Sequence, residues 1–176
     1  MIAPPVSHPQ GQARLADFEL TPRGLRFGSR FFPCAIGRGG IRADKVEGDG
    51  ATPRATLTVT GMFYRPDRIP APAPWAKPIG PRDLWSAASG EADYNTHVLA
   101  PYAASHEQMR RADPLYDLVI TTDWNAAPAV AGKGSAIFIH QWRRLAYPTA
   151  GCIALPRPIL HAIAPLMVPG RRILIR

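Results

Sequence analysis

Proline is the residue that most restricts what this chain can fold into. Twenty of the 176 residues are proline, which is roughly twice the average usage of about 5%. A proline inside a helix removes a hydrogen bond and clashes with the preceding turn, so this chain cannot consist mainly of long helices. The composition therefore predicts short strands joined by stiff loops, in a mostly β fold with one or two short helices.

Alternation of apolar and polar residues predicts where the strands lie. They are expected near 15–20, 24–28, 30–37, 55–64, 116–125, 134–142, 151–155 and 171–176. A short helix is expected over 105–116, opened by a serine cap and ended by a proline, and a second over 156–167, where apolar residues recur at helical spacing. The segments 37–55 and 65–90 are rich in glycine or proline and are expected to be surface loops. No strand–helix–strand repeat indicates a parallel sheet, so we predict a β-barrel or β-sandwich.

The length of the chain predicts one domain. Residues 1–13 carry prolines and no apolar periodicity and are expected to be a flexible tail, with a single domain over 14–176. No apolar run flanked by basic residues marks a secretory signal near the N-terminus. No stretch approaches the roughly 18 apolar residues of a membrane-spanning helix, so no membrane span is expected.

The net charge of +8 favours an anionic partner, such as nucleic acid, anionic lipid or an acidic cell-wall polymer. Many of the arginines come as isolated pairs, at 110–111, 143–144 and 171–172, rather than as basic tracts. Such pairs are typical of a solvated basic surface. Because no nucleic-acid recognition motif accompanies them, nucleic acid is not an expected partner.

The two cysteines do not form a disulfide framework or a metal-type pattern with histidine. Cys34 and Cys152 lie far apart in the sequence and neither belongs to a CxxC pair. Cys34 lies in an apolar segment and is expected to be structural. Phosphate-loop, GxSxG and HExxH motifs are also missing. We therefore expect neither a metal nor another cofactor.

The strand pattern places a histidine near the other cysteine. In the strand expected over 134–142, His140 shares one face with Phe138. The residues 141–150 are long enough to bring its end close to Cys152, which opens the next strand. A neighbouring imidazole can lower the pKa of a thiol into the reactive range. From the residues alone, a packing cysteine and a surface histidine are the more common roles for such residues, and catalysis stays the alternative.

Two separated motifs resemble one known family. The first is "IFIH", ending at His140, followed by "PTAGC" with Thr149, Gly151 and Cys152. The second is "DKVEGDGATPRATL" over 44–57, a glycine-rich stretch before a strand. In this order they resemble the L,D-transpeptidase catalytic domain of bacterial cell-wall enzymes. The resemblance implies a transpeptidase-like β-sandwich or barrel of mixed sheets.

The resemblance covers roughly residues 30–64 and 115–156, and three positions depart from the family pattern. Ala150 stands where a histidine precedes the glycine in the commoner signature, and Ala154 stands where an arginine follows the cysteine by two residues. Ala55 replaces a glycine of the second motif. A subgroup with an "AGCIAL"-type signature resembles this chain at both positions of the first motif. The usual arginine for substrate-carboxylate recognition is therefore absent.

The resemblance also assigns catalytic roles to residues of this chain. Cys152 is implied as the nucleophile and His140 as the base that takes its proton. Backbone amides around Gly151 and Cys152 are implied as the donors to the developing oxyanion. Thr149 is expected to orient His140 through its carbonyl or hydroxyl.

Four further residues near the motif are expected to bind substrate. Trp142 and Tyr147 flank it and are candidates for lining the acceptor side, with structural packing as the alternative. Arg143 or Arg144 is the candidate replacement for the arginine missing at position 154.

By resemblance, the partners are peptidoglycan stem peptides. The implied reaction passes the diaminopimelate carbonyl of a donor stem through a thioester to an amine of an acceptor stem, giving a 3-3 or 1-3 link. The alternatives are an L,D-carboxypeptidase or endopeptidase, which gives the same thioester to water, and a non-catalytic cell-wall-binding module. A monomer in the periplasm is expected, although no export segment is visible.

Overall fold

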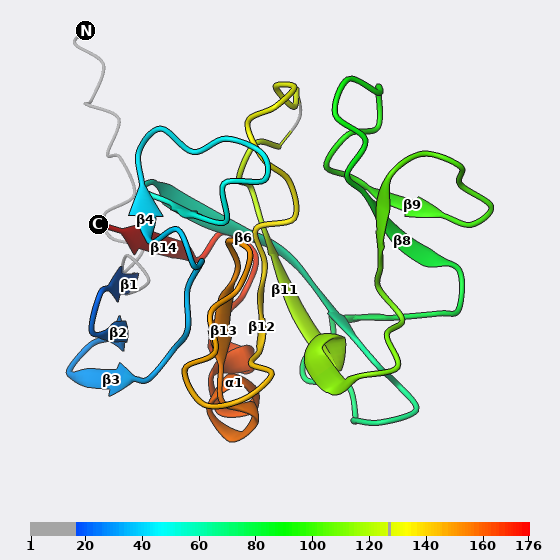
Figure 1. The fold of residues 1–176 in the computed structure, drawn as a ribbon. Coiled ribbons are helices and arrows are strands. Elements are labelled where there is room, and N and C mark those ends of the chain that lie inside the picture. Colours follow the sequence, from blue (N-terminus) through cyan, green and yellow to red (C-terminus); the bar gives the residue numbers. More distant parts are fainter. Residues whose placement is uncertain (1–16, 127) are drawn as a thin grey trace, which may run out of the picture.

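The computed structural model describes residues 17–126 and 128–176. The chain folds into a nearly closed barrel of mixed sheet with one short α-helix (Figure 1). The predicted mostly β fold class is therefore confirmed. The predicted tail, 1–13, lies outside the described residues, and the single domain over 14–176 stays a prediction.

Eight strands of the main sheet follow one another in the order β13, β12, β11, β6, β14, β1, β2 and β3, and β7 pairs with β6. Their bounds are β1 Phe18–Thr21, β2 Gly24–Phe27, β3 Arg30–Phe32, β6 Thr56–Tyr64, β7 Lys77–Pro78, β11 Leu118–Thr122, β12 Ile139–Gln141, β13 Ile153–Leu155 and β14 Arg172–Ile175. Two small sheets join β10 (His106–Gln108), β8 (Asp83–Ser86) and β9 (His97–Leu99), and β4 (Ile41–Arg42) with β5 (Thr52–Pro53). Figure 1 shows β8 and β9 on the opposite side of the molecule from β1–β3, with β11, β12 and β13 between them.

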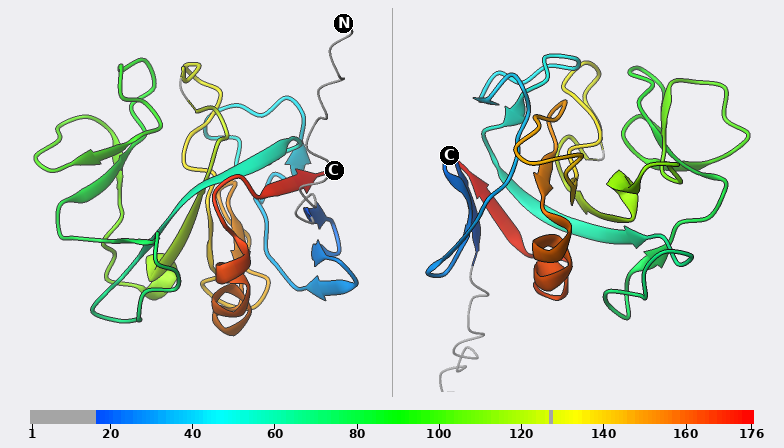
Figure 2. Two further views of the ribbon diagram at one scale, coloured as in Figure 1. Left: turned by 180° about the vertical axis from the view of Figure 1, so that it is seen from behind. Right: turned by 60° about the horizontal axis from the view of Figure 1, so that its bottom comes forward.

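The segment after β3 nearly closes the barrel. Ala35 and Ala154 of β13 exchange two backbone hydrogen bonds of 2.7 and 2.8 Å. Because β3 and β13 are the two ends of the main sheet, this pair brings its edges together. The long strand β6 crosses the molecule beside β14 and β11, as both views of Figure 2 show.

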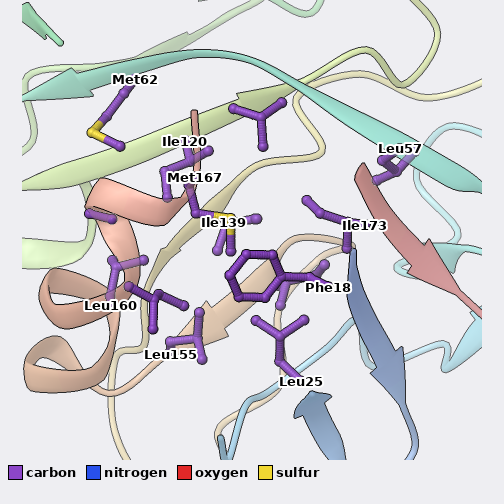
Figure 3. Close-up of a cluster of buried hydrophobic side chains, with 14 of the residues drawn as sticks. Phe18, Leu25, Leu57, Met62, Ile120, Ile139, Leu155, Leu160, Met167 and Ile173 are labelled. Carbon is purple, nitrogen blue, oxygen red and sulfur yellow. The ribbon is translucent and has the colours of Figure 1, made fainter. Parts of the chain in front are cut away.

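The main hydrophobic core fills the space between the barrel strands and α1 (Arg157–Ile163) (Figure 3). Strands from both halves of the chain contribute fully buried side chains, and α1 adds Leu160. Each such side chain stabilises the fold by roughly 1.5–3 kcal/mol relative to exposure. The buried members drawn and labelled in the figure are Phe18, Leu25, Leu57, Met62, Ile120, Ile139, Leu155, Leu160, Met167 and Ile173.

A second, smaller core cluster lies on the other face of β12. It contains Phe63, Tyr116, Val119, Ala136 and Phe138 among its buried members, and Cys152 packs against it. Because side chains alternate between faces along a strand, Phe138 belongs to this cluster while Ile139 belongs to the main core. The predicted faces of this strand are therefore confirmed.

The predicted helix over 105–116 is wrong. Residues His106–Gln108 form strand β10, which pairs antiparallel with β8, and only Pro114–Tyr116 forms a helical turn, the 3₁₀ turn η1. The serine cap and nearby glutamate are local signals, whereas the pairing with β8 joins segments about twenty residues apart, and it outweighs them. The second predicted helix is confirmed as α1, which continues into the 3₁₀ turn η2 (Ala164–Leu166).

Several predicted boundaries also differ from the structure. The expected loops 37–55 and 65–90 contain the short strands β4, β5, β7 and β8, because tertiary pairing gives these segments partners. The strand expected over 134–142 begins only at Ile139. Two parallel pairs, β1 with β14 and β12 with β13, make the sheet mixed without an intervening βαβ repeat.

Candidate active site

A cavity of about 400 Å³ lies where β13 begins. Its described lining includes His140 from β12, Cys152 just before β13, and Ala154 within β13. The connection between the two strands contributes Tyr147 and Thr149. The cavity therefore gathers the histidine and the cysteine that the sequence motif singled out.

The pairing of β12 with β13 places the imidazole and the thiol on one side of the sheet. The two strands lie side by side (Figure 1) and run parallel, and in their register His140 lies opposite Ala154. Cys152 precedes Ala154 by two residues, so its side chain points to the same face as His140. The predicted proximity of the two strand ends is confirmed.

The Cys152 thiol is neutral and hydrogen-bonded to the backbone. Its Sγ donates a hydrogen bond to the backbone oxygen of Ala136 over 3.1 Å. Burial first, and the negative charge of Glu107 second, raise the pKa of the thiol to about 12, although the backbone N–H groups of Phe138 and Cys152 and the charge of Lys45 each act in the opposite direction. The expectation that the imidazole lowers this pKa is therefore wrong here, because no hydrogen bond joins the thiol to His140.

The carbonyl that holds the thiol belongs to a residue with unusual backbone geometry. Ala136 has a φ of 51°, in the left-handed region, which is uncommon for a residue with a side chain. Its N–H donates to Oδ1 of the buried Asn95 over 2.9 Å. The Asn95 amide in turn donates to the backbone oxygens of Trp124 and Asn125. The left-handed conformation of Ala136 interrupts the strand predicted from 134, so β12 begins only at Ile139.

His140 is also neutral, which suits a general base. Its Nδ1 lies 2.8 Å from the backbone oxygen of Gln141. A carbonyl oxygen only accepts, so Nδ1 carries the hydrogen and Nε2 keeps its lone pair. Burial lowers the pKa of His140 to about 4, more than its bond to Gln141 raises it. At neutral pH the ring can therefore take up a proton through Nε2.

Gly151 allows the chain to pass closely under the 37–55 segment. Its φ of 145° lies in a region that side chains rarely adopt, and an added Cβ would lie 2.8 Å from the backbone oxygen of Ala51. Its carbonyl accepts from Thr52 Oγ1 over 2.8 Å, and its N–H donates to Thr149 Oγ1 over 3.1 Å. Of the two backbone amides predicted to hold an oxyanion, that of Gly151 therefore already has an acceptor.

Thr149 shapes the turn before the cysteine rather than orienting the histidine. Its Oγ1 donates to the backbone oxygen of Cys152 over 2.6 Å while accepting from Gly151. The expected bond from Thr149 to His140 is wrong, because the backbone of Gln141 occupies the Nδ1 position.

Only two of the four predicted substrate-binding residues line the cavity. Arg143 and Tyr147 do so, and the guanidinium of Arg143 lies 5.9 Å from the Tyr147 ring centroid. Arg144 stacks on the same ring at 4.4 Å but lies outside the lining. Trp142 is half-buried, also outside the lining, and its backbone N–H bonds to Leu155.

Sequence reasoning missed four lining residues that lie outside the motif. These are Glu107, Arg111 and Tyr116, together with Arg38 from the segment after β3. The Tyr116 hydroxyl donates to Glu107 Oε2 over 2.6 Å, and its ring lies edge-on to His140 with centroids 5.3 Å apart. The signal was the run of charged residues over 105–116, which we interpreted only as a short helix.

Two further features bear on the kind of site this is. Among the residues that the structure describes, no group of three or more histidine, cysteine or acidic side chains is arranged to hold a metal ion. No helix within the described ranges has the length and apolar character needed to cross a bilayer.

The family comparison agrees with the motifs. The YkuD family, the L,D-transpeptidase catalytic domain, matches residues 22–175, a range that includes the whole described lining of the cavity. No curated protein matches the chain. The chain therefore belongs to the YkuD family, and it is an enzyme of the L,D-transpeptidase type.

Proposed function

We propose that the protein is a peptidoglycan L,D-transpeptidase that uses Cys152 as its nucleophile and His140 as its base. The observation that carries this proposal is the shared cavity, in which a thiol and a neutral imidazole lie on one face of the sheet, and Nε2 of that imidazole has no hydrogen-bond partner among the residues that the structure describes. A nucleophile next to an oriented base is the arrangement that thiol acyl transfer needs.

The reaction begins when the thiol leaves the Ala136 carbonyl and turns toward His140. Nε2 takes the thiol proton as sulfur attacks the diaminopimelate carbonyl of the donor stem. The imidazolium then returns the proton to the leaving amine of the terminal D-residue, and a thioester remains on Cys152. General acid–base catalysis of this kind contributes roughly 10²–10⁴-fold to the rate.

The neutral resting pair has a chemical consequence. Because burial favours the thiol over the thiolate and the free imidazole over the imidazolium, an ion pair forms only as substrate binds and the proton moves. Such a site keeps its nucleophile protected from oxidants between turnovers, since the thiolate is the reactive form.

The acceptor decides between the proposed reaction and its nearest alternative. An amine of a second stem gives a cross-link, of the 3-3 or 1-3 type, whereas water gives an L,D-carboxypeptidase or endopeptidase. The cavity volume of about 400 Å³ falls within the roughly 300–1,000 Å³ of typical ligand sites, which is enough for a bound peptide segment. We further propose that the protein acts as a monomer in the periplasm.

A carbapenem tests whether the thiol can be acylated. The intact mass of the protein should rise by the mass of one carbapenem, and peptide mapping should place the adduct on Cys152. The Cys152→Ala protein should gain no adduct. If the native protein stays unmodified, the binding-module alternative is favoured.

Disaccharide-tetrapeptides then separate the two enzymatic alternatives. Incubation with the purified protein should give dimers joined through the third-position residue of the donor, identified by tandem mass spectrometry. Tripeptides alone would identify a carboxypeptidase.

A further inference from the structure

Glu107 is the one acidic side chain in the described lining of the cavity. It comes from strand β10 and is half-buried. Its Oε2 accepts from the Tyr116 hydroxyl over 2.6 Å, whereas its Oε1 has no hydrogen-bond partner among residues 17–126 and 128–176. One carboxylate oxygen is therefore fixed, and the other is available to a ligand.

Arg111, which lines the same cavity as Glu107, forms its ion pair with Asp113 instead. Arg111 donates to both carboxylate oxygens of Asp113, over 2.8 and 2.7 Å, and its guanidinium lies 5.2 Å from the Tyr116 ring centroid. No ion pair joins Arg111 to Glu107 within the part of the chain that the structure describes. Among the described residues Glu107 therefore has no direct ion-pair partner, although its charge helps to raise the pKa of Arg111.

This charge lies where it hinders the first half of the reaction. Apart from burial, Glu107 is the main cause that raises the pKa of the Cys152 thiol, so it opposes formation of the thiolate. In the second half of the reaction the sulfur carries an acyl group and an ammonium group enters the cavity. The same carboxylate can then act as a partner for that positive charge.

We infer that Glu107 is the specificity-determining residue for the acceptor, and that it binds the ammonium group of the acceptor stem beside the thioester. The inference rests on the proposed function and explains how an amine competes with water for the acyl group. The available Oε1 accepts from the ammonium, and a charge-assisted hydrogen bond of this kind is stronger than a neutral one.

The transfer step balances as follows. The bound ammonium loses one proton to water, and its nitrogen lone pair attacks the thioester carbonyl. Nε2 of His140 takes a second proton from that nitrogen. The tetrahedral species then collapses, so the C–S bond breaks as the new amide forms, and the leaving thiolate recovers the proton from the imidazolium.

The variant Glu107→Gln separates the two halves of the reaction because they should change in opposite directions. Acylation of Cys152 by a carbapenem should be faster than in the native protein, since the negative charge near the sulfur is gone. The ratio of dimer to trimmed tripeptide formed from disaccharide-tetrapeptides should fall about tenfold, because the ammonium loses its charged acceptor.

Glu47→Gln is a matched control. Glu47 Oε2 likewise accepts from a tyrosine hydroxyl, that of Tyr94, over 2.5 Å, but Glu47 does not line the cavity. Its acylation rate and its dimer-to-tripeptide ratio should equal those of the native protein. Glu107→Asp keeps the charge on a shorter side chain and should give an intermediate ratio.

The outcomes are distinguishable from failure of the proposed function. A dimer-to-tripeptide ratio in Glu107→Gln equal to that of the native protein overturns the inference about Glu107. Absence of acylation in the native protein overturns the proposed function instead. Acylation of the variant also shows that it is folded. If Glu107→Gln is not folded, an intermediate ratio in Glu107→Asp with a raised KM for the acceptor supports the inference, and a native ratio with an unchanged KM overturns it.

Discussion

The two cysteines of this protein share most of their physical properties but lie in different surroundings. Both are half-buried free thiols, and burial raises the pKa of Cys34 to about 11 and that of Cys152 to about 12. Cys34 packs against the main hydrophobic core. Cys152 packs against the second cluster and faces a cavity that also contains His140.

The comparison shows that neither burial nor acidity marks a nucleophile here. By thiol pKa alone, Cys34 would be the more reactive residue. What distinguishes Cys152 is the base beside it and the space for a substrate in front of it. The following predictions test that distinction, and they begin with the largest expected effect.

Replacing each cysteine by alanine should separate the two residues by activity. Cys152→Ala should lower dimer formation from disaccharide-tetrapeptides by more than about 10³-fold, as loss of a nucleophile does in other acyl-transfer enzymes. Cys34→Ala should stay within about twofold of the native rate. Comparable losses in both variants would mean that the cavity is not the site of the chemistry.

Removing the base should affect one thiol only. His140→Asn should slow transpeptidation by roughly 10²–10⁴-fold and should slow alkylation of Cys152 by iodoacetamide, measured by peptide mass spectrometry. The alkylation rate of Cys34 in the same sample is the internal reference and should not change. His161→Asn is the matched control, since His161 lies on α1 outside the cavity lining.

The buried neutral groups predict how stability depends on pH. The pKa of His140 is lowered by burial to about 4, so the unfolded chain binds more protons and the free energy of unfolding falls by roughly 3 kcal/mol as the pH falls from 6.5 to 4. At alkaline pH the raised pKa values of both thiols have a similar effect. The free energy of unfolding falls as the pH rises from about 9 towards 12, because the unfolded chain loses these protons first.

Urea unfolding across this pH range measures both slopes. In His140→Asn the loss of stability between pH 6.5 and 4 should shrink by most of its size, while the alkaline loss should remain. An unchanged acid slope in that variant would show that the ring is not held neutral by burial.

The smallest expected effect is on the free energy of unfolding, where replacing Cys34 should cost more than replacing Cys152. Cys34→Ala should lower the free energy of unfolding by about 1 kcal/mol, because it deletes a sulfur that packs against the main core. Cys152→Ala should cost less, because its sulfur borders an open cavity. Denaturant midpoints of the two variants against the native protein provide the comparison.

The strands and the second helix were predictable because their signals are local. The β-branched alternation over Thr56–Tyr64 and the proline-led apolar run of Arg157–Ile163 each describe one element without reference to the rest of the chain. Strand β10 was not predictable in this way. It exists because β8 offers it a partner, and the pairing of distant segments is absent from any local pattern.

The candidate site also has one part that local sequence signals predict and another part that depends on long-range packing. The motif around His140 and Cys152 follows from residue types, and the two-residue period of a strand predicts which neighbours share a face with each of them. The presence of Glu107 and Arg38 in the lining could be seen only in the folded chain, because these residues come from segments far from the motif in sequence.

The sequence by itself determined a mostly β chain with a cysteine and a histidine at the mouths of two neighbouring strands. Only the tertiary structure decided that both groups are neutral at rest, that the Ala136 carbonyl holds the thiol, and that a carboxylate faces it. The physical reason is that proton affinity depends on the water, charges and dipoles within a few ångströms of a group. Those neighbours are assembled by long-range packing and not by the order of residues along the chain.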